Sequence, residues 1–287
     1  MGRLAYVNGR FVPHPQARVH VEDRGYQFAD GVYEVVPVAN GRLVDEELHL
    51  DRLDRSLAEL RIGWPMSRAA LRLVSHELIR RNGLANGIVY VQVTRGVAPR
   101  DHKFPKGVKP ALVMTTKQLK RASPAVLAQG LKVVTVPDIR WQRRDIKSIS
   151  LLPNCLAKQQ AFEAGATEAW MVEPGGYVTE GSSTNAWIVT GEGKVVTRKA
   201  NHEILNGITR QVLLKVMAEE GLVLDERPFS VEEAYKAREA FLTSSSNFVM
   251  PVTEIDGRPI GNGHPGLVTQ RLRRSYLATF GLDEEAA

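Results

Sequence analysis

The chain changes character within one stretch, Trp141-Gln142-Arg143-Arg144-Asp145-Ile146-Lys147-Ser148-Ile149-Ser150-Leu151-Leu152. Polar residues run directly into an apolar segment, as expected where a chain leaves the surface for a pocket. Lys147 lies where the polar residues end and the apolar segment begins. Most lysines are solvated surface charges, but this position favours an amine directed into the interior.

A second polar motif contains Glu180, which lies 33 residues after Lys147 in Val178-Thr179-Glu180-Gly181-Ser182-Ser183-Thr184-Asn185. An exposed turn is the usual fate of such a composition. Lys147 and Glu180 together nevertheless match the needs of one kind of chemistry. A lysine that can form an imine, and an acid that keeps a pyridine nitrogen protonated, are the two groups that amine chemistry on a pyridoxal cofactor requires.

Two further segments could bind a phosphate. Gly207-Ile208-Thr209 opens a predicted helix, whose first turn offers backbone N–H groups and a positive dipole end. Arg52 shares one face of an earlier predicted helix with His49 and Ser56, and its guanidinium suits a phosphate dianion. Taken alone, each segment is more typical of an ordinary helix start or a surface charge.

Composition limits the class of protein. The 287 residues contain 43% hydrophobic and 24% charged residues and a formal charge of +6, which is typical of a soluble globular protein. The basic residues are scattered, so nucleic-acid binding is not expected. A single cysteine, Cys155, excludes an internal disulfide and indicates a reducing compartment. We expect it to be buried as a small hydrophobic residue.

Membrane and metal sites are also not expected. No apolar run approaches the ~20 residues of a membrane helix, and no Cys/His spacing of the zinc type is present. The first nine residues reach a hairpin signal at once and leave no room for the apolar core of a signal peptide. The sequence therefore predicts a cytoplasmic protein.

The hydrophobic pattern predicts an α+β protein of two domains. Asn8-Gly9 and Asn40-Gly41 each lie between strand-forming stretches and indicate hairpins. Expected strands are 4–7, 10–12, 32–38, 42–44, 88–94, 111–115, 131–136, 168–172, 186–190, 194–197, 239–243 and 249–255; expected helices are 45–62, 67–82, 154–164, 208–220 and 266–279. We expect a small domain over residues 1–117, a linker over 118–124, a larger domain over 125–287, and an active site in the cleft between the domains.

Spaced motifs make the chain resemble the D-amino-acid aminotransferases, within the class IV fold of pyridoxal-phosphate enzymes. They are Glu22-Asp23-Arg24-Gly25-Tyr26-Gln27-Phe28, Asp30-Gly31-Val32-Tyr33-Glu34-Val35, His49-Leu50-Asp51-Arg52-Leu53, Val93-Thr94-Arg95-Gly96, Pro99-Arg100 with His102, Asp145-Ile146-Lys147-Ser148, Thr179-Glu180-Gly181-Ser182-Ser183 and Gly207-Ile208-Thr209-Arg210. Two positions depart from the pattern. Ala29 replaces a usual glycine, and Phe248, after a serine-rich turn over 243–247, replaces a common acidic residue.

The resemblance implies pyridoxal 5′-phosphate as cofactor and assigns a role to each candidate residue. Lys147 is the catalytic residue, which holds the cofactor and moves the substrate proton; Lys158, further along the chain, is expected to be solvated. The remaining cofactor-binding residues are Glu180 at the pyridine nitrogen and Arg52, Ile208, Thr209 and Ser245 at the phosphate. Tyr33, Arg100 and His102 are the substrate-binding residues, which trap the α-carboxylate.

The expected reaction is transamination of D-alanine and 2-oxoglutarate to pyruvate and D-glutamate, by a homodimer whose partners are otherwise only small amino and 2-oxo acids. Alternatives of the same fold are a branched-chain L-amino-acid transaminase, an (R)-amine transaminase and an aminodeoxychorismate lyase. A non-catalytic cofactor-binding protein is the alternative of another class; the presence of both Lys147 and Glu180 argues against it.

Overall fold

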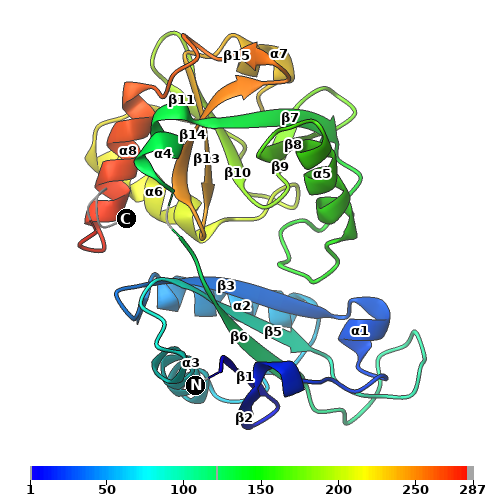
Figure 1. The fold of residues 1–287 in the computed structure, drawn as a ribbon. Coiled ribbons are helices and arrows are strands. Elements are labelled where there is room, and N and C mark those ends of the chain that lie inside the picture. The colour runs from blue at the N-terminus through cyan, green and yellow to red at the C-terminus, as the bar shows by residue number, and fades with distance from the viewer. Residues whose placement is uncertain (1, 121, 283–287) are drawn as a thin grey trace. The chain divides into compact units, whose positions relative to one another are not determined.

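The computed structural model describes residues 2–120 and 122–282. The chain divides into two compact units. Unit 1 contains residues 1–120 and 146–150, and unit 2 contains residues 121–145 and 151–287. Figure 1 shows the elements of both units.

This division differs from the expected one at the segment around Lys147. Residues 146–150 belong to unit 1, whereas the sequence placed them in the second domain. The physical reason is that this segment pairs with β3 (Gly31–Ala39), where Lys147 and Ser148 contact the backbone of Tyr33 and Val32. The expected linker 118–124 also contains regular structure, because β6 extends to Gln118 and α4 begins at Pro124. Residue 121 of that linker, residue 1 and residues 283–287 lie outside the described residues.

Unit 1 is built on a six-stranded antiparallel sheet of order β2-β1-β6-β5-β3-β4. Its strands are β1 (Leu4–Val7), β2 (Arg10–Pro13), β3 (Gly31–Ala39), β4 (Arg42–Leu43), β5 (Gly87–Thr94) and β6 (Ala111–Gln118). Its helices are η1 (His14–Gln16), α1 (Arg24–Phe28), α2 (Glu46–Glu59) and α3 (Arg68–Asn82). Helix α2 packs on β3, and α3 packs on β1 and β6 (Figure 1).

Both predicted hairpins are confirmed. Asn8 and Gly9 have φ of 44° and 94°, and Asn40 and Gly41 have φ of 50° and 75°. Positive φ at both turn residues matches the right-handed twist of the flanking strands, which is why Asn-Gly occurs there. Gly83 ends α3 with a φ of 57°, as the sequence predicted.

Unit 2 contains a mixed nine-stranded sheet of order β12-β11-β10-β13-β14-β7-β8-β9, with β15 paired to β14. Its strands are β7 (Leu131–Pro137), β8 (Glu168–Val172), β9 (Val178–Gly181), β10 (Asn185–Val189), β11 (Val195–Thr197), β12 (Leu224–Glu226), β13 (Glu239–Ser244), β14 (Phe248–Ile255) and β15 (Arg258–Pro259). Its helices are α4 (Pro124–Gln129), α5 (Leu152–Glu163), α6 (Ile208–Glu219), α7 (Val231–Tyr235) and α8 (Leu267–Ala278).

Each unit has its own core. In unit 1, Leu53 and Leu57 of α2 and Leu78 of α3 pack against strand residues such as Val89 and Met114. In unit 2, Trp187 stacks on Phe241 with ring centroids 5.4 Å apart, between α6, α8 and the sheet. Within the part of the chain that the structure describes, no helix is long and apolar enough to cross a membrane.

Candidate active site

Lys147 is fixed to β3 of unit 1 through its backbone. Its carbonyl accepts a hydrogen bond of 3.0 Å from the Tyr33 amide, and Ser148 forms an isolated bridge with Val32. The Lys147 amide is 3.3 Å from the hydroxyl of buried Ser56 on α2. The side chain turns back over β3, so that Nζ lies 4.2 Å from the centroid of the Tyr33 ring. The structure therefore brings together two of the predicted site residues.

Arg52 belongs to a buried charge network in unit 1. Its Nε and Nη2 each donate to Glu34 on β3 at 2.8 Å, and the Glu34 carboxylate is 2.7 Å from His49 Nδ1. Burial alone would raise the pKa of Glu34, but the charge and hydrogen bonds of Arg52 outweigh it and lower this pKa to about 2. Burial lowers the pKa of His49. Arg52 is thus held in one orientation by an ionised partner.

Arg100 and His102 lie in the exposed loop over residues 99–104 of unit 1. The guanidinium carbon of Arg100 is 4.5 Å from the centroid of the Phe28 ring, and the centroid of the His102 ring is 5.4 Å from the same Phe28 centroid. Both side chains therefore lie on the same side of the loop, as their alternation in the sequence predicted. Tyr33 contacts Lys147 and Tyr90 instead, with the two tyrosine ring centroids 5.7 Å apart.

Glu180 is buried on β9 of unit 2. Its carboxylate accepts hydrogen bonds from Arg140 Nη1 at 2.5 Å, from Asn185 Nδ2 at 2.9 Å and from the Leu205 amide at 3.1 Å. Burial raises the pKa of Glu180, although Arg140 opposes the shift. Arg140 in turn binds Asp138, whose pKa is lowered to about 2 because the hydrogen bond and charge of Arg140 overcome the effect of burial. The acid is therefore surrounded by N–H donors.

The first turn of α6 lies next to Glu180, because Asn185 connects them. The Asn185 amide nitrogen donates both to Glu180 and, at 2.9 Å, to the Leu205 carbonyl two residues before Gly207. A Cβ at Gly207 would lie only 2.2 Å from Asn185 Oδ1, so any other residue there would displace the Asn185 side chain. Among the described residues no side chain caps α6. Its first N–H groups, near buried Ile208 and Thr209, can therefore bind an anion.

Ser245 lies in the turn between β13 and β14. This turn follows Thr243, which pairs with Asn185 across the sheet. Arg273 of α8 holds the far side of the turn, where its Nη1 donates to the Asn247 carbonyl at 3.1 Å and to the Val249 carbonyl at 2.8 Å. The three phosphate candidates of unit 2, Ile208, Thr209 and Ser245, are thus positioned by elements that meet at Asn185.

The two departures from the family pattern share one backbone property. Ala29 has a φ of 54° and Phe248 a φ of 59°, both in the left-handed region. Non-glycine residues are strained there. The usual glycine at position 29 is explained by this conformation, which ends α1.

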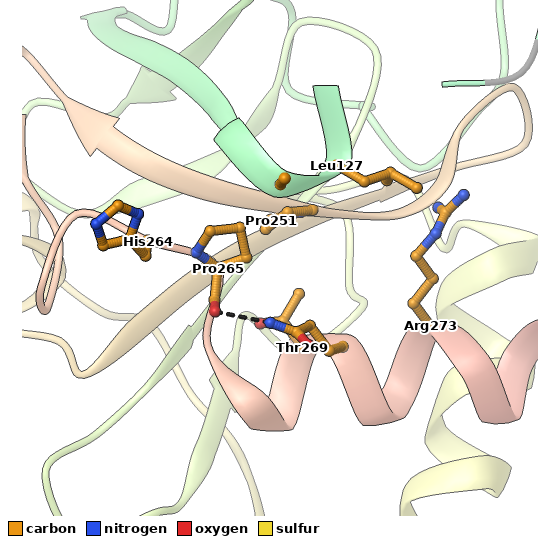
Figure 2. A pocket seen from close by; sticks show the side chains of 8 residues that line it. Leu127, Pro251, His264, Pro265, Thr269 and Arg273 are labelled. Atoms are coloured by element: carbon orange, nitrogen blue, oxygen red, sulfur yellow. Dashed lines mark hydrogen bonds between the residues drawn. The ribbon is translucent and has the colours of Figure 1, made fainter. Parts of the chain in front are cut away.

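A pocket of about 390 Å³ lies elsewhere in unit 2 (Figure 2). It is lined by Leu127 of α4, Pro251 of β14, the loop residues His264 and Pro265, and Thr269 and Arg273 of α8. None of the predicted site residues lines it. The Gln270 amide, which also lines the pocket, donates to the Pro265 carbonyl at 2.9 Å.

Two predictions about single side chains have opposite outcomes. Lys158 is exposed, as expected, and its Nζ donates to the Thr167 carbonyl at 2.5 Å. The expectation for Cys155 is wrong, because this residue is exposed. Helix α5 buries only Ala157 and Ala161, and Cys155 lies two residues from Ala157, on the other side of the helix. Among the described residues, no cluster of three or more His, Cys, Asp or Glu side chains could hold a metal ion.

Comparison with known proteins identifies the family. Residues 31–255 match the family described as amino-transferase class IV. The D-alanine aminotransferase of Staphylococcus haemolyticus is 40% identical over 272 residues, which cover 94% of this chain and 95% of that protein. The D-alanine aminotransferase of Bacillus licheniformis is 40% identical over 266 residues, or 93% of each chain.

Solved structures agree with these matches. A T.th. branched-chain amino acid aminotransferase, crystallised with pyridoxamine 5′-phosphate, has a TM-score of 0.90 and 25% identity, over 100% of this chain and 97% of that one. The fold and the relatives together define an enzyme that transfers amino groups. This chain belongs to the amino-transferase class IV family. The fold and the family expected from the sequence are confirmed.

Proposed function

We propose that this enzyme uses pyridoxal 5′-phosphate to transaminate D-amino acids, and that it converts D-alanine and 2-oxoglutarate to pyruvate and D-glutamate. The substrate follows from the curated relatives, which are D-alanine aminotransferases at 40% identity. The family and the pyridoxamine 5′-phosphate of the T.th. structure support the choice of cofactor.

The residues of unit 2 fit this cofactor, and buried Glu180 is the observation that carries the proposal. A buried carboxyl group held in one orientation by three N–H donors would accept a hydrogen bond from a pyridine nitrogen and stabilise a proton on it. Beside it, the first turn of α6 offers uncapped N–H groups, near Ile208 and Thr209, to a phosphate. We assign Ser245 to the same phosphate.

Unit 1 supplies the remaining roles. When bound, the cofactor provides an aldehyde for covalent attachment and a ring that accepts electrons from the substrate carbon. We assign attachment and proton transfer at the substrate α-carbon to the Lys147 amine. The Tyr33 amide holds the Lys147 backbone carbonyl, and the Tyr33 ring lies next to Nζ. Arg52 is assigned to the phosphate. Since Glu34 neutralises it, Arg52 contributes oriented N–H groups more than net charge.

Arg100, His102 and Tyr33 are assigned to the substrate α-carboxylate. A guanidinium and an imidazole on one side of a loop can bind a carboxylate with directed hydrogen bonds. Fixing the carboxylate decides which enantiomer presents its α-hydrogen to the base, and therefore the stereochemistry of the reaction.

A branched-chain L-amino-acid transaminase is the second candidate, favoured by the structural match to the T.th. enzyme at 25% identity. The purified enzyme should be incubated with 2-oxoglutarate and either D-alanine, L-alanine or L-leucine, and the glutamate enantiomer identified by chiral chromatography. We expect D-glutamate from D-alanine alone. Formation of L-glutamate from L-leucine, without turnover of D-alanine, would establish the second candidate instead.

Borohydride reduction followed by peptide mapping tests the assignment of Lys147. The pyridoxyl label should appear on the peptide containing Lys147 and be absent from the Lys147→Ala variant. Lys158→Ala is the matched control, because Lys158 is an exposed lysine in the following helix, and it should retain the label. A label on any other lysine contradicts the assignment.

We also propose a homodimer located in the cytoplasm. Leu152 and Leu156 lie one turn apart on α5 and are 71% and 47% exposed, so they offer an apolar strip that a second copy can cover. Sedimentation should give about twice the mass of 31.8 kDa. Replacing both leucines by glutamate should shift the enzyme toward the monomer, whereas Leu73→Glu on α3 should not.

A further inference from the structure

The Phe28 ring contacts both side chains that are assigned to the substrate carboxylate. Its centroid is 4.5 Å from the guanidinium carbon of Arg100 and 5.4 Å from the His102 ring centroid. The guanidinium carbon of Arg24 lies 4.8 Å from the same centroid. A cation next to an aromatic face is attracted by the negative charge of the π system. One ring at the end of α1 thus contacts two guanidinium groups and an imidazole.

The backbone of the loop is also attached to α1. Arg24 is 3% exposed, and its Nη1 donates to the Asp101 carbonyl at 2.5 Å while Nη2 lies 3.4 Å from the His102 carbonyl. Asp101 is the residue between Arg100 and His102, so these carbonyls belong to the same short segment as the two side chains. The hydrogen bonds from Arg24 therefore fix the direction in which both side chains leave the loop.

A single carboxylate orients the arginine that holds the loop. Asp30 accepts from Arg24 Nε at 2.7 Å and from Arg95 Nε and Nη2 at 2.8 and 2.9 Å. The Arg95 guanidinium carbon is 3.5 Å from the Phe104 ring centroid, at the end of the same loop. Burial would raise the pKa of Asp30, but the two arginines lower it, so the carboxylate stays ionised.

An ordinary exposed loop does not need this construction. Arg100, His102 and Phe104 are exposed, yet the loop is tied to two buried arginines that share one carboxylate. Burying charged groups is costly unless each is paired. The arrangement makes physical sense if the orientation of the exposed side chains matters.

We propose that Phe28 is a positioning residue for carboxylate recognition: its ring, fixed next to Arg24, holds the Arg100 and His102 side chains on one side of the loop, ready for the substrate α-carboxylate. This inference rests on the proposed function, in which Arg100 and His102 bind that carboxylate. Phe28 itself contacts neither substrate nor cofactor in this role. The ring already restricts the orientations of the two side chains. Less conformational entropy is therefore lost when the carboxylate binds.

The test compares Phe28→Leu with Phe28→Tyr and Tyr26→Leu in the holoenzyme. Tyr26 is on the same short helix but points to solvent, with 76% exposure, and is the matched aromatic control. For each variant KM and kcat for D-alanine are measured, together with the inhibition constant of propionate, which has a carboxylate but no amino group. Cofactor retention is followed by absorbance after gel filtration.

Phe28→Leu should raise both KM for D-alanine and the propionate inhibition constant by about three-fold or more, because a cation–π contact is lost. Its kcat and its cofactor retention should stay close to those of the unaltered enzyme. Phe28→Tyr, which keeps an aromatic face, should restore both constants, and Tyr26→Leu should not change them.

The inference and the proposed function fail in different ways. If the unaltered enzyme does not turn over D-alanine, the proposed function is wrong. If Arg100→Ala raises both constants but Phe28→Leu raises neither, the function stands and the positioning role is refuted. The role is also refuted if Phe28→Leu lowers kcat and cofactor retention without changing the propionate constant. Should Phe28→Leu not fold, the same constants in Phe28→Tyr and Phe28→Met decide the matter, because only the methionine variant should raise them.

Discussion

The side-chain oxygen of Asn185 lies 2.2 Å from the place that a Cβ would take at Gly207. The same side chain donates to Glu180 and to the Leu205 carbonyl. Asn185 therefore sets the spacing between the acid on β9 and the first turn of α6. A side chain at position 207 would therefore push the Asn185 side chain away from these partners.

Gly207→Ala should weaken cofactor binding for this reason. The added methyl would push Asn185 away, so that Glu180 loses one of its donors while it stays buried, at a cost of about 1–3 kcal/mol. The expected result is a rise in the cofactor dissociation constant of about tenfold or more, measured by titrating the apoenzyme with pyridoxal phosphate. Gly191→Ala, in a loop where a Cβ would meet nothing within 4 Å and the backbone has no positive φ, is the control. Equal affinity of Gly207→Ala and the unaltered enzyme would contradict this account of Asn185.

Two effects of removing Arg52 can be separated. Arg52→Ala should lower cofactor retention and also leave Glu34 as a buried charge without its arginine, which destabilises a protein by about 3–5 kcal/mol. Replacing Glu34 by glutamine in the same chain should recover much of that stability but not the retention. Urea unfolding of the apoenzyme and gel filtration of the holoenzyme measure the two quantities. If the double variant recovers retention as well, Arg52 does not bind the phosphate.

Acid should destabilise the apoenzyme through Glu34. Burial would raise the pKa of this carboxyl, but Arg52 and His49 lower it from 4.5 to about 2 in the folded protein. The unfolded chain therefore binds the proton more tightly. The contribution to stability, about 3 kcal/mol, is complete above pH 4.5 and is lost as the pH falls from 4.5 toward 2. Glu34→Gln should show a shallower fall in the free energy of unfolding over this range. Identical slopes would refute the contribution.

Ala29→Gly should stabilise unit 1. Ala29 has a φ of 54°, a conformation that costs an L-residue about 1–2 kcal/mol. Glycine removes this strain but adds freedom to the unfolded chain, so the expected gain is about 0.5–1 kcal/mol. Ala58→Gly, at an exposed position of α2, should instead destabilise the protein. Thermal unfolding of the two variants measures the change in stability of each. A loss of stability in Ala29→Gly would contradict the argument.

The sequence predicted those features that depend on near neighbours. Asn8-Gly9 and Asn40-Gly41 determine their turns locally, and the apolar spacing of Leu50, Leu53 and Leu57 determines α2. The sequence does not predict the short elements. Helix α1 has five residues, too few for a periodic pattern, and β9 carries Glu180 in a composition that is typical of a turn.

The sequence also does not predict which charged side chains pair with residues distant in the chain. Arg140 is 40 residues from Glu180, and Glu34 is 18 residues from Arg52. Each of these residues is an ordinary charged residue in the sequence, and only the pairing of strands and helices brings it to its partner. Asn185 was visible in the motif after Glu180, but its contact with Gly207 depends on the packing of α6.

The segment carrying Lys147 has a consequence for how the chain is made. Residues 146–150 complete unit 1, yet the 25 residues from 121 to 145, which belong to unit 2, are translated before them. A nascent chain released after residue 120 would keep the pairing of β3 with β5 but would lack Lys147 and Ser148, which pair with Tyr33 and Val32 on the other side. The reactive amine therefore reaches its position late in synthesis, and an isolated amino-terminal fragment cannot carry it.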